Sequence, residues 1–136
     1  QSDSLFRMLI KAEPDNYLVM NNFSYYLAVR GEFLEEARAI SYRTIMENPE
    51  NGTFLDTYAW VLYKLKEYKE AERYINKALQ KGGLNDPDVN EHAAEIHMNL
   101  QSYHIARSFY EKAIILGGDK EKLEEKLKIL DAIDEK

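Results

Sequence analysis

The chain has 136 residues, of which 45% are hydrophobic and none is cysteine, and its formal net charge is −6, so one domain with a core of its own is expected. The negative charge argues against nucleic acid as a partner, and without an apolar run of about 18 residues or a signal segment we expect a soluble chain with no direct membrane contact. The absence of cysteine excludes disulfides and thiolate chemistry but suits the cytosol and a periplasm equally, so the compartment stays open.

The first predicted element is a helix over residues 4–14. Only six glycines and three prolines interrupt a sequence rich in good helix formers, which favours an all-α fold. Within "SLFRMLIKA", one apolar face is formed by Leu5, Phe6, Leu9 and Ile10. The sequence has no initiator Met, so we expect this face to meet a preceding helix in a longer protein, or to pair with a second copy as a homodimer.

From residue 17 to residue 118 the chain repeats itself with a period of 34 or 35 residues. Small residues recur in three series, which are Ser24, Ala59 and Ala94, then Ala37, Ala71 and Ala106, and then Thr44, Ala78 and Ala113. Large residues recur beside them, as Phe33, Tyr68 and Tyr103 and as Leu27, Leu62 and His97. Small residues let two helix axes approach while large neighbours fill the space beside them, so we expect both sets in the core.

Each unit of the repeat divides into two helical patterns joined by a tight turn. In the middle unit an apolar face recurs at i, i+3, i+4 and i+7 over residues 55–62. The second helix of that unit is predicted to end at Gly82 and Gly83, because glycine takes the left-handed conformation that closes a helix. The third unit is predicted to begin at Asp86 and Pro87, a capping residue followed by proline at the first helical position.

The last predicted element is a helix over residues 119–134. It places Leu123, Leu127, Leu130 and Ile133 on one stripe, with Lys and Glu elsewhere. Stacked repeats need a terminal helix with a polar outer face to cover their last apolar surface. We therefore interpret this segment as a capping helix.

These recurring positions resemble the tetratricopeptide repeat (TPR) family, whose helix–turn–helix units are about 34 residues long. The clearest segments are "YKLKEYKEAERYINKAL" at 63–79 and "MNLQSYHIARSFYEKAI" at 98–114. The resemblance implies a right-handed α-solenoid of antiparallel helix pairs, the TPR superhelix, in a single domain over residues 1–136. That domain would comprise a half-repeat helix at 4–14, repeats at 17–50, 52–83 and 86–118, and the capping helix at 119–134. Such arrays occur in both cytoplasmic and exported bacterial proteins.

No pattern in the sequence indicates catalysis, a metal site or a cofactor. His92 and His97 are five residues apart, about 140° around a helix axis, so they cannot share a metal as an i,i+4 pair can. We interpret His97 as a packed histidine with one hydrogen-bond partner and His104 as a solvated residue at a turn. No nucleophile-elbow or phosphate-loop motif occurs. We therefore expect no enzyme activity.

In the TPR family the first helices of successive units line a concave groove, and the resemblance implies which residues face it. These are Asn21, Asn22, Tyr25, Asp56, Trp60, Tyr63, Lys64, Glu91 and Glu95. Two interpretations of Trp60 stay open. It either packs against Tyr25 on the groove floor, or the two rings form an exposed anchor for a basic peptide with an apolar residue, beside the carboxylates of Asp56, Asp88, Glu91 and Glu95.

Two functions remain after these exclusions. The family's clamp for a C-terminal carboxylate uses Lys, Arg and Asn, but here the matching positions carry Asn21, Asp56 and Glu91, and only Asn22 keeps the pattern. We therefore predict a non-enzymatic scaffold that binds a protein or peptide segment in the groove. The alternative is a structural or self-associating segment of a longer repeat protein, without a peptide ligand of its own.

Overall fold

The computed structural model describes residues 2–134 of the chain. In this range it contains eight α-helices and one short 3₁₀ helix, and no strand. The α-helices are α1 (Ser2–Ala12), α2 (Tyr17–Arg30), α3 (Leu34–Glu47), α4 (Gly52–Lys64), α5 (Tyr68–Gln80), α6 (Pro87–Asn99), α7 (Tyr103–Ile115) and α8 (Lys120–Asp134), and the 3₁₀ helix is η1 (Gly83–Asn85). The predicted all-α fold is confirmed.

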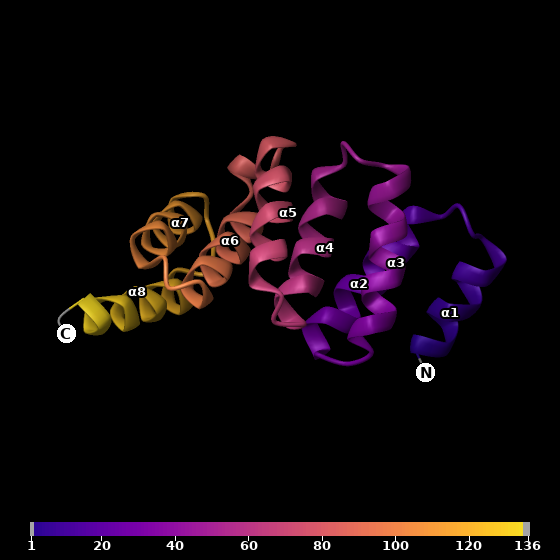
Figure 1. Ribbon diagram of the computed structural model, residues 1–136, viewed down its shortest axis with the longest axis horizontal. Coiled ribbons are helices and arrows are strands. Elements are labelled where there is room, and N and C mark those ends of the chain that lie inside the picture. Colours follow the sequence, from indigo (N-terminus) through magenta and orange to yellow (C-terminus); the bar gives the residue numbers. More distant parts are fainter. Residues whose placement is uncertain (1, 135–136) are drawn as a thin grey trace.

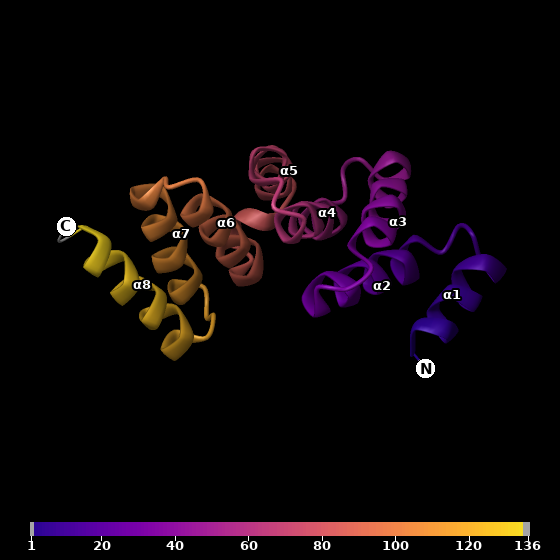
Figure 2. The same ribbon diagram turned by 60° about the horizontal axis from the view of Figure 1, so that its bottom comes forward.

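The helices form a row of hairpins that runs from one end of the molecule to the other (Figure 1). The closest packing occurs within the successive pairs α2 and α3, α4 and α5, and α6 and α7, and each pair also packs on the next. Seen from the second direction, α3 and α5 stand along the upper side of the row, and α1 and α8 lie at its two ends (Figure 2). The architecture is a helical-repeat solenoid of antiparallel helix pairs.

The first helix of each pair begins at a polar residue that caps it. The side chains of Asn16 and Asn51 accept hydrogen bonds from the backbone N–H of Val19 and Phe54, at 3.1 and 3.0 Å. Asp86 accepts two such bonds at the start of α6, where proline follows it. These caps satisfy backbone donors that have no partner within the helix, so they fix where α2, α4 and α6 begin.

Each tight turn within a pair contains a non-glycine residue with a positive φ, and the α2–α3 turn also contains Gly31, with a φ of 74°. The non-glycine residues are Phe33, Lys66 and Gln101, with φ between 52° and 66°. Phe33 lies directly before α3, whereas Lys66 and Gln101 lie two residues before their helices begin. Phe33 is therefore 56% exposed, and the prediction that it belongs to the core is wrong. Leu34 opens α3 in the way that Tyr68 and Tyr103 open α5 and α7.

Glycine is required at the two neighbouring positions after α5 for different structural reasons. Gly82 has a φ of 105°, a conformation that a side chain strains. Gly83 instead lies so close to its surroundings that an added Cβ would be 2.7 Å from the backbone oxygen of Ala78 and 2.8 Å from Val89. Gly117 and Gly118 repeat this division of roles one period later.

All nine small residues of the three recurring series are completely buried, as predicted. They lie between the helices of each pair, where large side chains such as Leu62, Ile75 and Ile96 complete the packing around them. His97, which stands where other units have leucine, is also buried. The core is thus a chain of contacts between neighbouring repeats rather than one central cluster.

The terminal helices close the two ends of the array. In α1 the ring of Phe6 stacks on Phe23 with centroids 5.0 Å apart, and Ile10 packs against the same core. The four apolar residues predicted as one free face are therefore divided, because Phe6 and Ile10 turn inward while Leu5 is 57% exposed. At the other end, Leu123 and Leu130 of α8 are fully buried against the last repeat. No described helix combines the length and hydropathy needed to cross a bilayer.

Candidate functional site

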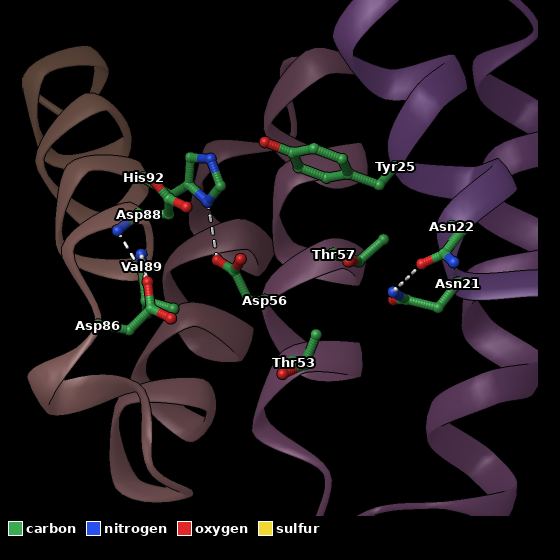
Figure 3. Close-up of a pocket in the computed structure, with 10 residues that line it drawn as sticks. All are labelled: Asn21, Asn22, Tyr25, Thr53, Asp56, Thr57, Asp86, Asp88, Val89 and His92. Atoms are coloured by element: carbon green, nitrogen blue, oxygen red, sulfur yellow. Dashed lines mark hydrogen bonds and ion pairs between the residues drawn. The ribbon is translucent and has the colours of Figure 1, made fainter. Parts of the chain in front are cut away.

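Helices α2, α4 and α6 line a continuous groove made of three adjoining hollows. The first hollow has a volume of about 260 Å³ and lies where these helices begin and in their first turns (Figure 3); its lining is Asn21, Asn22, Tyr25, Thr53, Asp56, Thr57, Asp86, Asp88, Val89 and His92. The other two, of about 260 and 220 Å³, share Trp60, Lys64, Glu91 and Lys122. We call these the acidic hollow and the aromatic hollows. All nine residues predicted to face the groove line at least one of them.

A buried ion pair between α4 and α6 separates the two parts of the groove. Nδ1 of His92 lies 2.8 Å from Oδ1 of Asp56, and both residues are buried. Burial disfavours the charged imidazole, but the Asp56 carboxylate outweighs it, so the pKa of His92 is raised above its usual 6.5. The pair therefore favours the protonated form of the imidazole in the groove floor.

Trp60 stacks on two rings, and neither of them is Tyr25. Its centroid lies 4.1 Å from that of His92 and 4.4 Å from that of Tyr63, with nearly parallel planes. Tyr25 approaches His92 from α2, with centroids 6.2 Å apart. The imidazole of His92 is thus the ring that both aromatic side chains contact, and it replaces the direct packing of Trp60 on Tyr25 that the sequence left open.

Two carboxylates of α6 are already paired with side chains of the last two helices. Glu91 forms an ion pair with Lys122 at 2.7 Å, and Glu95 forms one with Lys126 at 3.2 Å. The hydroxyl of Tyr110 donates a further hydrogen bond to Glu95. Of the four carboxylates predicted to attract a basic ligand, three therefore have an ion-pair partner within the chain, and only Asp88 has none among residues 2–134.

The phenols near Glu95 report the same negative surroundings. Burial and the Glu95 carboxylate raise the pKa of Tyr63 to about 12. Burial, together with its hydrogen bond to Glu95, also raises the pKa of Tyr110. At the acidic hollow, burial and the carboxylates of Asp56 and Asp88 raise the pKa of Tyr25. These hydroxyls stay protonated and act as hydrogen-bond groups rather than as bases.

Sequence reasoning missed the contribution of α8 to the groove. Lys122 and Lys126 line the aromatic hollows, although α8 was expected only to cover an apolar face. A signal existed, because these lysines are four residues apart on one helix face and so are Glu91 and Glu95 on another. The linking role of His92 had no comparable signal, since it depends on the approach of two helices from different repeats.

The described residues contain no group of three or more His, Cys, Asp or Glu side chains able to hold a metal ion. His97 is packed as predicted, with its ring stacked on Phe109 at 5.7 Å. Its Nδ1 has no hydrogen-bond partner in the described part of the chain, however, and lies 3.7 Å from Glu72. At this distance Glu72 is not a hydrogen-bond partner of Nδ1, and burial lowers the pKa of His97.

The stacked hairpins and the groove along their first helices define a helical-repeat protein of the α-solenoid class. The family model of the tetratricopeptide repeat matches residues 54–80, which span α4 and α5. The TPR repeat-containing protein PA4667 of Pseudomonas aeruginosa is 34% identical over 95 residues, which are 70% of this chain and 16% of that protein. The chain belongs to the tetratricopeptide repeat family, and it spans only 16% of the length of this relative.

Solved structures of repeat domains share the fold. The first TPR domain of the human RPAP3 protein superposes with a TM-score of 0.77 at 18% identity, over 88% of this chain and 92% of that one. A chain in a T3SS complex from Aeromonas hydrophila gives 0.75 at 16% identity, over 94% and 89%. TPR domains are in general modules for protein–protein interaction.

Proposed function

We propose that this chain is a non-enzymatic scaffold that binds an extended peptide segment of a partner protein in the groove of α2, α4 and α6. The observation that carries the proposal is the continuity of the three hollows, which offer aromatic surface at Trp60 and Tyr25 beside the exposed Asp88 carboxylate at one end. Aromatic side chains in a polar rim are typical anchors of peptide recognition. The expected partner segment is basic and carries an apolar residue.

The chemistry of the groove supports this choice of ligand. The acidic hollow is lined by three Asp side chains and by no Lys or Arg. Lys64 lies over the Trp60 ring at 5.9 Å, so the indole face already accommodates a cation beside it. A C-terminal carboxylate would meet Asp56 and Glu91 at the positions where the family's clamp uses cations, and like charges there would repel it.

A selection from a random peptide library displayed on phage tests the proposal. The selected peptides are synthesised, and their affinities are measured by fluorescence polarisation for the wild type and for Tyr25→Ala. Tyr42→Ala is the matched control, because Tyr42 is 44% exposed and Tyr25 is 37% exposed, but Tyr42 lies on α3 outside the groove. We expect Tyr25→Ala alone to weaken binding, by about tenfold for an aromatic anchor. Equal affinities of the two variants would contradict the proposal.

Self-association through α1 is a second candidate function. The observation in its favour is that Leu5 and Met8 are 57% and 68% exposed on one helix. Light scattering at increasing concentrations tests it, since the mass should rise for the wild type and stay constant for a Leu5→Lys, Met8→Lys variant. A mass that never changes with concentration would remove this candidate.

A further inference from the structure

We propose that the acidic hollow is a binding site for a guanidinium group, the side chain of an arginine in the partner segment. This inference rests on the proposed function, because the hollow is one end of the same groove. It adds the chemical identity of the group that binds there, and it assigns this role to Asp56, Asp88 and Asn21.

The first step of the argument is the state of the carboxylates. Asp56 uses Oδ1 for His92, and the structure gives its other oxygen, Oδ2, no partner within residues 2–134. The Asp88 carboxylate is exposed on the opposite wall and also has no hydrogen-bond or ion-pair partner in that range. Asp86, by contrast, is committed to capping α6. Two acceptors from different helices are thus left to face one hollow.

The second step is a buried amide that points into the same space. Asn21 is only 4% exposed, and Figure 3 shows its side chain directed from α2 toward α4. Its Oδ1 is buried and has no hydrogen-bond partner among residues 2–134. A buried oxygen in this state destabilises the free protein, so a ligand that donates a hydrogen bond to it gains more than it would at an exposed oxygen.

The third step concerns the shape and the charge of the ligand. A guanidinium group is planar, carries five N–H donors and gives up its water more readily than an ammonium group. It can therefore donate to Asp56, Asp88 and Asn21 at once while its face lies against the ring of Tyr25. Burial raises the pKa of Tyr25 first, and the carboxylates of Asp56 and Asp88 raise it further, and such a cation would offset the charge of these two.

Other ligands fit these groups less well. No set of three or more ligating side chains suited to a metal ion occurs among the described residues, which includes this hollow. A lysine ammonium presents three donors from one point and has no face to stack. The contrast with the aromatic hollows is also informative, because there the chain supplies Lys122 and Lys126. Among residues 2–134 no Lys or Arg lines the acidic hollow, and its one basic side chain, His92, is paired with Asp56.

The test uses short peptides and the complete 136-residue chain. The probe is the tripeptide acetyl-Gly-Arg-Gly-amide, and its neutral control replaces arginine with citrulline, which has nearly the same shape. Binding is followed by ¹⁵N–¹H NMR titration. We expect saturable shifts in the amides around Asn21, Thr57 and Asp88, and binding at least about tenfold weaker for citrulline, since the charge-assisted bonds are lost.

Three variants sharpen this test without touching the core. Asp88→Asn should weaken arginine binding about fivefold, and Asn22→Asp, which adds a carboxylate at the exposed rim, should strengthen it by a similar factor. Glu111→Gln on α7 is the control for charge alone, because this exposed residue lines none of the hollows, and it should change nothing.

Two outcomes overturn the inference. One is equal affinity for the arginine and citrulline peptides, and the other is equal affinity for the arginine peptide and a lysine tripeptide. Its failure is distinguishable from failure of the proposed function. If peptides from the library bind in a manner that depends on Tyr25 but contain no arginine and do not respond to Asp88→Asn, the groove function stands and the guanidinium site falls.

Discussion

His92 and Trp60 stack with their ring centroids 4.1 Å apart, so a buried ion pair and the chain's single tryptophan form one unit. Asp56 holds the imidazole from below, and Trp60 covers its face. Trp60, for which the sequence left open both packing and an anchor role, therefore takes part in the packing of α4 on α6. Tyr25 and Asp88 are better positions at which to test binding alone, because neither is buried.

The first prediction concerns the pH dependence of stability. The pKa of His92 is raised in the folded state above 6.5, so its pairing with Asp56 contributes stability that is fully present below pH 6.5. That contribution is lost as the pH rises through the raised value. Denaturant unfolding of the wild type and of His92→Gln, at about pH 6 and about pH 9, should show the wild-type advantage shrink at the higher pH.

Two controls separate this effect from the titration of other groups. Asp56→Asn removes the partner and should abolish the same pH dependence. His104→Gln removes an exposed histidine on α7 and should leave it unchanged. Because Trp60 is the only tryptophan, its fluorescence should also change as His92 titrates, with a midpoint above 6.5. A wild-type advantage that grows with pH would show that the imidazole is neutral in the folded state.

Much of the fold was predictable because local and repeated signals agree. The series of small residues, the caps at Asn51 and Asp86, and the glycine stops each mark the same period. The prediction for Phe33 was wrong because α3 begins one residue later, relative to the repeat, than α5 and α7 do. The position of a residue with a positive φ within a turn has no clear signal in a single sequence. Local sequence signals thus predict the helices better than they predict the turns between them.

The candidate site was predictable only to the extent that it follows from the repeat. The inward positions of α2, α4 and α6 recur with the period, so the residues of the groove could be named. The sequence could not predict which carboxylates stay unpaired. Their pairing depends on where α8 docks and on the ion pairs made by Lys122 and Lys126. Charge along a sequence predicts the electrostatics of a groove poorly when partners come from another element.

Gly83→Ala is predicted to be destabilising although φ at this position is ordinary. An added Cβ would lie 2.7 Å from the Ala78 carbonyl oxygen and 2.8 Å from Val89, and backbone cannot move away as a side chain can. We expect the free energy of unfolding to fall by about 1–3 kcal/mol. Denaturant unfolding measures it. A loss below about 0.5 kcal/mol would mean that α5 and α6 can separate here without cost.

Ala71→Leu is predicted to overpack the second repeat. Ala71 is completely buried where α4 and α5 approach each other, and three extra carbon atoms have no space there. The cost should be about 1–3 kcal/mol. Ala39→Leu on α3 is the matched control, because Ala39 is exposed and the same change should stay within about 0.5 kcal/mol. Similar losses in both variants would contradict close approach of the helices at Ala71.

The last prediction concerns the lysines by which α8 neutralises the groove. Lys122→Gln with Lys126→Gln removes the partners of Glu91 and Glu95. Because these pairs are partly exposed, the free energy of unfolding should fall by no more than about 1 kcal/mol for each. The released carboxylates should then strengthen the binding of basic peptides several-fold, as measured by fluorescence polarisation. Hydrogen exchange should rise in α8 and stay unchanged in α4.

The matched control for this pair is Lys120→Gln with Lys128→Gln, which removes the same charge from α8 at exposed positions that line none of the hollows. If both double variants strengthen peptide binding equally, net charge alone is responsible, and the specific pairing of α8 with the groove has no role in affinity. If only the first does, α8 competes with basic ligands for Glu91 and Glu95. In that case the affinity of the groove depends on a helix that the repeat pattern assigns only to capping.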